Sequence, residues 1–143
     1  MQKAFGLTGE NMETYRGVRI TSTYFSGHKN VVYDTIQRSV TQICREGRGV
    51  GAFYIGIASG PDYYFALSRR IDAKKMDRGV TDMYLLYQSS SERNTCDLER
   101  WLIDHFREIK PDDRLWNSAI GGGGRPGSGP YFFLYLATTF DPD

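Results

Sequence analysis

The chain has 143 residues, enough to bury one hydrophobic core, and we expect a single domain over 1–143. Its formal net charge of +1 excludes the strongly basic surface with which proteins grip long duplex nucleic acid. No stretch has the apolar run of a signal peptide or a membrane span, and Cys44 and Cys96 read as lone thiols. We therefore expect an intracellular protein, cytoplasmic or nuclear, with no membrane partner.

The first third of the chain predicts a strand followed by a helix. Residues 1–16 are polar and show little pattern, which indicates a loose N-terminal arm or an edge element. Residues 18–25 alternate and are rich in β-branched side chains, which predicts a strand. Apolar residues then recur at helical spacing up to about 46, with Asn30 placed to cap the helix and Gly47 placed to end it.

The remaining chain predicts two further helices and three further strands. Ala52–Gly60 has the composition of a buried strand that ends in a turn, and Gly60-Pro61-Asp62 opens a helix that Gly79 ends. The later elements are a strand over 80–87, a helix capped by Asn94 or Thr95 and running to about Glu108, a glycine tract over 121–129 and a strand over 130–138. This order predicts an α+β domain with a small, mostly antiparallel sheet flanked by about three helices.

Four elements in a fixed order carry a family resemblance. They are Tyr54-Ile55-Gly56 on a strand, Arg70 on the next helix, Glu99 on the last helix and Asn117 in the loop that follows. This series resembles the GIY-YIG endonuclease family over roughly residues 50–125. The resemblance implies a GIY-YIG-like fold and a metal-dependent nuclease that hydrolyses phosphodiester bonds in DNA or RNA. It also implies Mg²⁺ or another divalent cation as cofactor, and nucleic acid or a nucleotide as partner.

Each of these residues has a role and a simpler alternative. Phosphodiester hydrolysis needs a positively charged group that binds the phosphate. Arg70 is our first choice for this group and Arg69 our second. The alternative is that both are solvated arginines on the helix surface. Glu99 shares a helix face with Ile103 and Phe106, so its carboxylate lies on semi-buried ground and needs a partner. That partner is a metal ion such as Mg²⁺, or an arginine such as Arg70.

The strand and loop residues follow the resemblance. It implies that Tyr54 orients the attacking group or the phosphate, and that Asn117 braces the wall of the site. The simpler reading of Asn117 is a turn asparagine before glycines.

The tyrosine that the family uses to activate water has no counterpart where it is expected, about ten residues upstream of Tyr54, in Thr41–Cys44. Two substitutes are available in the sequence. One is Gly17-Val18-Arg19, with Tyr24 or His28 further along, and the other is Gly129-Pro130-Tyr131. We favour Tyr131, which requires the strands of the sheet to be connected in a different order.

The glycine tract is a candidate phosphate cradle. Glycines let backbone amides approach an anion, as at Gly123 and Gly124, and Arg125 adds charge. The alternative is a flexible surface loop. A second functional hypothesis uses this loop: a catalytically silent protein that binds a nucleotide or small phosphorylated ligand, with Tyr63, Tyr64 or Tyr131 stacking on the base. A protein-interaction module is the third hypothesis.

Overall fold

One mixed sheet forms the centre of the protein. The computed structural model describes residues 12–45, 48–73, 79–117, 127 and 129–141. The strands are β1 (Met12–Tyr15), β2 (Val18–Phe25), β3 (Val50–Gly60), β4 (Val80–Ser89) and β5 (Tyr131–Phe140), in the order β1-β2-β4-β5-β3. Only β2 and β4 pair in parallel, so the sheet is mostly antiparallel, as predicted. Residues 12–15 of the expected arm form the edge strand β1.

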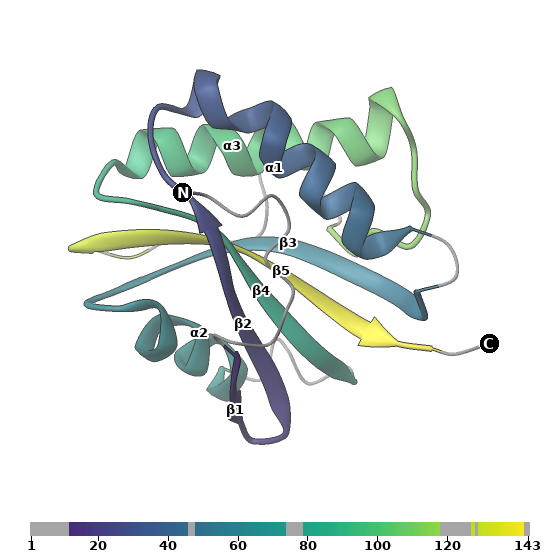
Figure 1. Cartoon of the computed structure of the whole chain (residues 1–143), viewed down its shortest axis with the longest axis horizontal. Helices are drawn as coiled ribbons and strands as arrows, with labels where there is room; N and C mark the ends of the chain where they lie inside the picture. The colour runs from purple at the N-terminus through teal and green to yellow at the C-terminus, as the bar shows by residue number, and fades with distance from the viewer. Residues whose placement is uncertain (1–11, 46–47, 74–78, 118–126, 128, 142–143) are drawn as a thin grey trace.

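Helices cover both faces of this sheet (Figure 1). Helices α1 (Lys29–Cys44) and α3 (Glu92–Asp104) lie on one face, and α2 (Tyr63–Asp72) lies on the other. Alternate residues of β3 and β5 feed the two cores: Ile55 and Leu136 face α1 and α3, whereas Ala58 and Phe133 face the side of α2. In the described part of the chain, no helix combines the length and apolar character needed to cross a bilayer.

Helices α1 and α3 begin earlier than the sequence pattern predicts. The Nδ1 atom of His28 accepts a hydrogen bond from the backbone N–H of Asn30 at 3.1 Å, so His28 and not Asn30 caps α1. Ser91 caps α3 by accepting from the backbone N–H of Asn94 at 3.1 Å. Asn94 and Thr95, the predicted caps, therefore lie inside the first turn, because Ser91 supplies the nearest acceptor before them.

Helix α2 ends earlier than predicted, whereas the helical segment that begins with α3 continues to Ile109, close to the predicted end near Glu108. Helix α2 ends at Asp72, where the N–H of Ala73 bonds back to the carbonyls of Arg69 and Arg70 at 3.0 and 3.3 Å. Gly79 lies at the start of β4, and residues 74–78 lie outside the described ones. The α-helical part of α3 ends at Asp104, and its last turn widens into the π-helix η1 (His105–Ile109).

The segment after η1 covers the free edge of β3. The N–H of Phe53 donates to the carbonyl of Arg114 at 3.0 Å, and Trp116 N–H donates to the carbonyl of Phe53 at 2.8 Å. One step along, the side-chain amide of Asn117 accepts from Ile55 N–H at 3.0 Å and donates to Ile55 O at 2.8 Å. Because peptide groups alternate in direction along a strand, the carbonyl of Ile57 points toward this same edge.

Replacing Asn117 with alanine tests this edge. The substitution leaves both polar groups of Ile55 without their buried partner, so we expect the free energy of unfolding to fall by roughly 2–4 kcal/mol. Urea denaturation measures the change. Asn30→Ala, at an exposed asparagine, is the matched control and changes stability by less than about 0.5 kcal/mol. Equal effects of the two substitutions would contradict a bracing role for Asn117.

Candidate active site at the edge of strand β3

The glycine of Tyr54-Ile55-Gly56 makes room for two tyrosines. In the β3–β5 register, Gly56 lies directly across from Tyr135. A Cβ atom at Gly56 would lie 2.6 Å from the hydroxyl oxygen of Tyr135 and 2.8 Å from Cε2 of Tyr54. The two rings are tilted by 38° with centroids 6.3 Å apart. Only glycine therefore lets these two rings close over the strand.

Arg70 reaches the free edge of β3. Its Nε and Nη2 atoms donate to the carbonyl of Ile57 at 3.0 and 2.6 Å. Since that carbonyl points away from β5, the half-buried guanidinium lies beside the edge and not over the middle of the sheet. The arginine is thus fixed in place by a backbone acceptor that needs a partner.

Glu99 approaches the same place from the other face. Its side chain on α3 is only 6% exposed. Burial raises the pKa of Glu99 to about 8, and the positive charge of Arg70 opposes this rise. Arg70 is thus a positively charged neighbour of this buried carboxylate. The two helices lie on opposite faces of the sheet, and the charge of Arg70 nevertheless acts on Glu99.

Tyr135 shares the electrostatic environment of both charged residues. Burial is the main reason that the pKa of its hydroxyl is raised, and Tyr54 adds to the effect. Glu99 raises this pKa further, whereas Arg70 lowers it. The hydroxyl therefore stays protonated at neutral pH, when it can orient a ligand by hydrogen bonding.

The structure brings together three of the predicted site residues and adds one that was missed. Tyr54 packs at Gly56, Arg70 binds Ile57, and the charge of Arg70 acts on Glu99. Asn117 binds the backbone of Ile55 within the same motif, which is a bracing contact. Tyr135 was missed because its importance depends on the pairing of β3 with β5. A tyrosine within the predicted apolar strand over 130–138 was the available signal.

The two substitutes for the missing tyrosine lie elsewhere. Tyr131 lies across from Gly60 and is 41% exposed, four residues before Tyr135 on the same strand. Gly17 precedes β2, whose partners are β1 and β4, so that motif does not pair with Tyr54-Ile55-Gly56. In the family, the strand that pairs with this motif comes before it. Here that strand is β5, which comes after it.

A cavity extends from Arg70 along α2. It has a volume of about 430 Å³ and its lining includes Gly60, Phe65, Arg69, Arg70, Gly127 and Gly129; we call it the α2 groove. The end of the glycine tract thus lies beside Arg69 and Arg70. This position is compatible with the predicted phosphate-binding role of Arg69. The predicted phosphate-binding residues Gly123, Gly124 and Arg125 lie outside the described residues.

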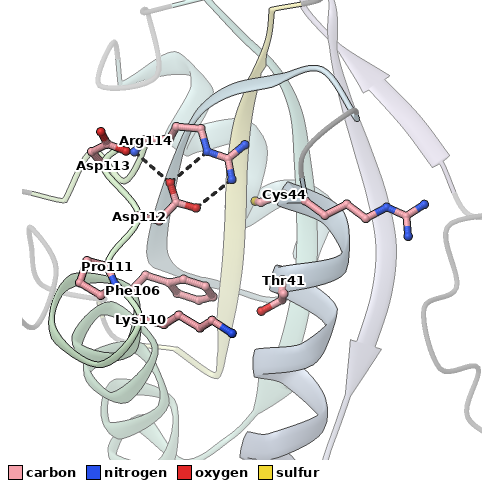
Figure 2. Close-up of a pocket in the computed structure, with 9 residues that line it drawn as sticks. Thr41, Cys44, Phe106, Lys110, Pro111, Asp112, Asp113 and Arg114 are labelled. Carbon is pink, nitrogen blue, oxygen red and sulfur yellow. Dashed lines mark hydrogen bonds and ion pairs between the residues drawn. The ribbon is translucent and has the colours of Figure 1, made fainter.

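A second cavity, of about 490 Å³, lies at the other end of β3 (Figure 2). Arg114 holds Asp112 through two guanidinium nitrogens, Nε at 3.0 Å and Nη2 at 2.8 Å, and its Nη1 reaches the carbonyl of Val50 at 3.2 Å. Burial raises the pKa of the Cys44 thiol to about 12, so this cysteine is not a reactive nucleophile. The lining of this cavity mixes acidic and basic groups, and the cavity lies at the far end of β3 from Gly60. It contains none of the predicted site residues, so we place the candidate site at Glu99 and not here.

Within the described part of the chain, no group of three or more His, Cys, Asp or Glu side chains is arranged to hold a metal ion. A cation at Glu99 would therefore depend on water and ligand oxygens for its remaining coordination.

Comparison with known proteins found no matching family model, no similar curated protein and no similar solved structure. The GIY-YIG resemblance thus rests on the residues and contacts described above.

The raised pKa of Glu99 predicts a pH dependence of stability. Between the ordinary value near 4.5 and about 8, the folded chain keeps a proton that the unfolded chain releases. The free energy of unfolding should therefore fall as pH rises through this window, by roughly 3–5 kcal/mol in total, and then level off. Glu99→Gln should flatten the profile, as measured by urea denaturation in EDTA between pH 5 and 9. Glu92→Gln changes an exposed glutamate of the same helix and should leave the pH profile of stability unchanged. Parallel profiles for Glu99→Gln and the parent would contradict a raised pKa of Glu99 in the folded protein.

Proposed function

We propose that the chain is a GIY-YIG-like nuclease, which hydrolyses phosphodiester bonds in nucleic acid with a divalent cation. The observation that carries the proposal is the position of Glu99, a buried carboxylate whose charged neighbour is Arg70. Burying a carboxylate is costly, and perturbed groups of this kind cluster at functional sites. Tyr54 and Tyr135 complete the constellation beside it.

Glu99 fits the chemistry of a hard divalent cation. Its oxygens are the ligand type that Mg²⁺ prefers, and Mg²⁺ is commonly held by one or two carboxylates together with phosphate oxygens and water. The buried Glu99 supplies one such carboxylate. When bound, the cation would supply positive charge to the phosphate oxygens.

The other residues act through charge and orientation. The two bonds to Ile57 O fix the guanidinium of Arg70, so its charge is held ready for a phosphate oxygen. The hydroxyls of Tyr54 and Tyr135 would orient the attacking water or a phosphate oxygen. Because the pKa of Tyr135 is raised, this residue serves as a neutral hydrogen-bonding group and not as a phenolate base. Asn117 holds the backbone of Ile55, between Tyr54 and Gly56.

One observation favours the second hypothesis, a silent protein that binds a nucleotide. The pKa of Glu99 near 8 leaves its carboxyl largely protonated at neutral pH in the absence of a cation. A neutral Glu99 beside Arg70 and the α2 groove would suit the phosphate of a bound nucleotide. The cleavage experiment below separates the two functions.

Magnesium-dependent cleavage of single- and double-stranded DNA and RNA tests the proposal. We expect the parent protein to cut at least one of these substrates, and activity to rise with pH as Glu99 loses its proton. Glu99→Gln and Tyr135→Phe should each lower kcat by roughly 100-fold or more, because each removes a group aimed at the reacting phosphate.

Matched controls come from the same elements of structure. Glu92→Gln on α3 and Tyr24→Phe on β2 change exposed residues of the same types and should keep full activity. Absence of cleavage with Mg²⁺ or Mn²⁺, combined with nucleotide binding that survives Glu99→Gln, would overturn the nuclease and support the silent protein.

A further inference from the structure

The α2 groove has one sign of charge along its described lining. Arg69 and Arg70 both line it, and no carboxylate does so among the residues that the structure describes. The cavity at the far end of β3 differs, since Asp112 and Asp113 line it together with its cations. A groove of about 430 Å³ falls within the usual size of a small-ligand site, ~300–1,000 Å³. Charge and size together favour an anionic ligand of about nucleotide size.

An exposed aromatic ring lines this groove. Phe65 is 44% exposed, and Gly60 forms the floor beneath it, where a Cβ atom would lie 2.9 Å from the Phe65 ring. The guanidinium of Arg69 lies 5.6 Å from the centroid of the same ring. Tyr131, also exposed, lies directly across from Gly60 on β5. Phe65 and Arg69 therefore lie together beside Gly60 in the groove, and Tyr131 lies next to Gly60 on the neighbouring strand.

This combination suits a nucleobase that is not already paired and stacked. Aromatic rings and arginine planes stack on bases in sequence-tolerant fashion, at roughly 1–3 kcal/mol for each base. In a continuous duplex both faces of a base are covered by its neighbours, so the base would first have to be extruded. The net charge of +1 also provides little general attraction for a long duplex.

Arg70 joins the groove to the candidate active site. The same guanidinium that lies beside Glu99 also lines the groove that contains Phe65. A nucleotide with its base against Phe65 would thus have its phosphate on the side of Arg70 and Glu99. We propose that the α2 groove receives an unpaired nucleobase next to the scissile phosphate, so that the substrate is a single-stranded or flapped nucleic acid. Only the cleavage at that phosphate rests on the proposed nuclease function.

Binding without turnover tests the groove. Fluorescence anisotropy of short labelled oligonucleotides, with the parent protein in EDTA, compares single-stranded DNA, single-stranded RNA, the matching blunt duplex and an abasic strand that keeps the phosphates. We expect the single strands to bind at least roughly 5-fold more tightly than the duplex and the abasic strand. The DNA and RNA arms identify which sugar the groove accepts.

Variants then assign the effect to Phe65. Phe65→Ala should weaken single-strand binding by roughly 5-fold to 100-fold and leave duplex binding unchanged, whereas Phe65→Trp should retain the preference. Phe140→Ala, at an exposed phenylalanine at the far end of β5, is the matched control and should bind as the parent does. Thermal unfolding checks that each variant is folded.

The outcomes separate this inference from the proposed function. Equal affinity for single strand and duplex, or single-strand binding that Phe65→Ala leaves intact, overturns the inference even if the protein cleaves nucleic acid. Single-strand binding that depends on Phe65, in a protein that cleaves nothing with any divalent cation, supports the groove and overturns the nuclease.

Discussion

The free edge of β3 determines the arrangement of the candidate site. An edge strand exposes peptide groups that need partners, and here the partners are not another strand. The backbone of Arg114 and Trp116 binds Phe53, the amide of Asn117 binds Ile55, and the guanidinium of Arg70 binds Ile57. The requirement to satisfy this edge therefore brings an arginine from the opposite face of the sheet to the position where Glu99 can meet it.

Two carboxylates on α3 show how much the surroundings decide their chemistry. Asp97 accepts hydrogen bonds from Lys29 on α1 and from Arg100, and the Lys29 contact is the main reason that its pKa is lowered. Glu99 lies two residues further on, in the buried face of the same helix, and burial raises its pKa to about 8. Asp97 thus ties α3 to α1 as a permanent anion, whereas Glu99 can gain or lose a proton near neutral pH.

Local pattern predicted the fold class and identified most residues of the candidate site, because those features depend on residues close in sequence. The strand pattern around Tyr54 and the helix face that Glu99 shares with Ile103 and Phe106 both survive in the structure. Tyr135 could not be identified in the same way, since its position across from Gly56 depends on a strand register set about eighty residues away. The start of α1 was also missed, because its N-cap is His28 and not the asparagine that the sequence pattern predicted.

Strand β5 makes the site a property of the whole fold. It pairs with β3 on one side and β4 on the other, although it is the last strand in the chain. Tyr54, Arg70 and Glu99 all come from the segment between Val50 and Asp104, but burial of Tyr135 beside them requires β5 to be inserted between β3 and β4. The cross-strand pair of Tyr135 and Gly56 therefore joins residues that are far apart in sequence. Closing the chain between them costs conformational entropy, which the local elements cannot offset alone. It follows that the chain acquires its complete tyrosine pair only when the full sheet has assembled, and that any activity at Glu99 requires the intact domain.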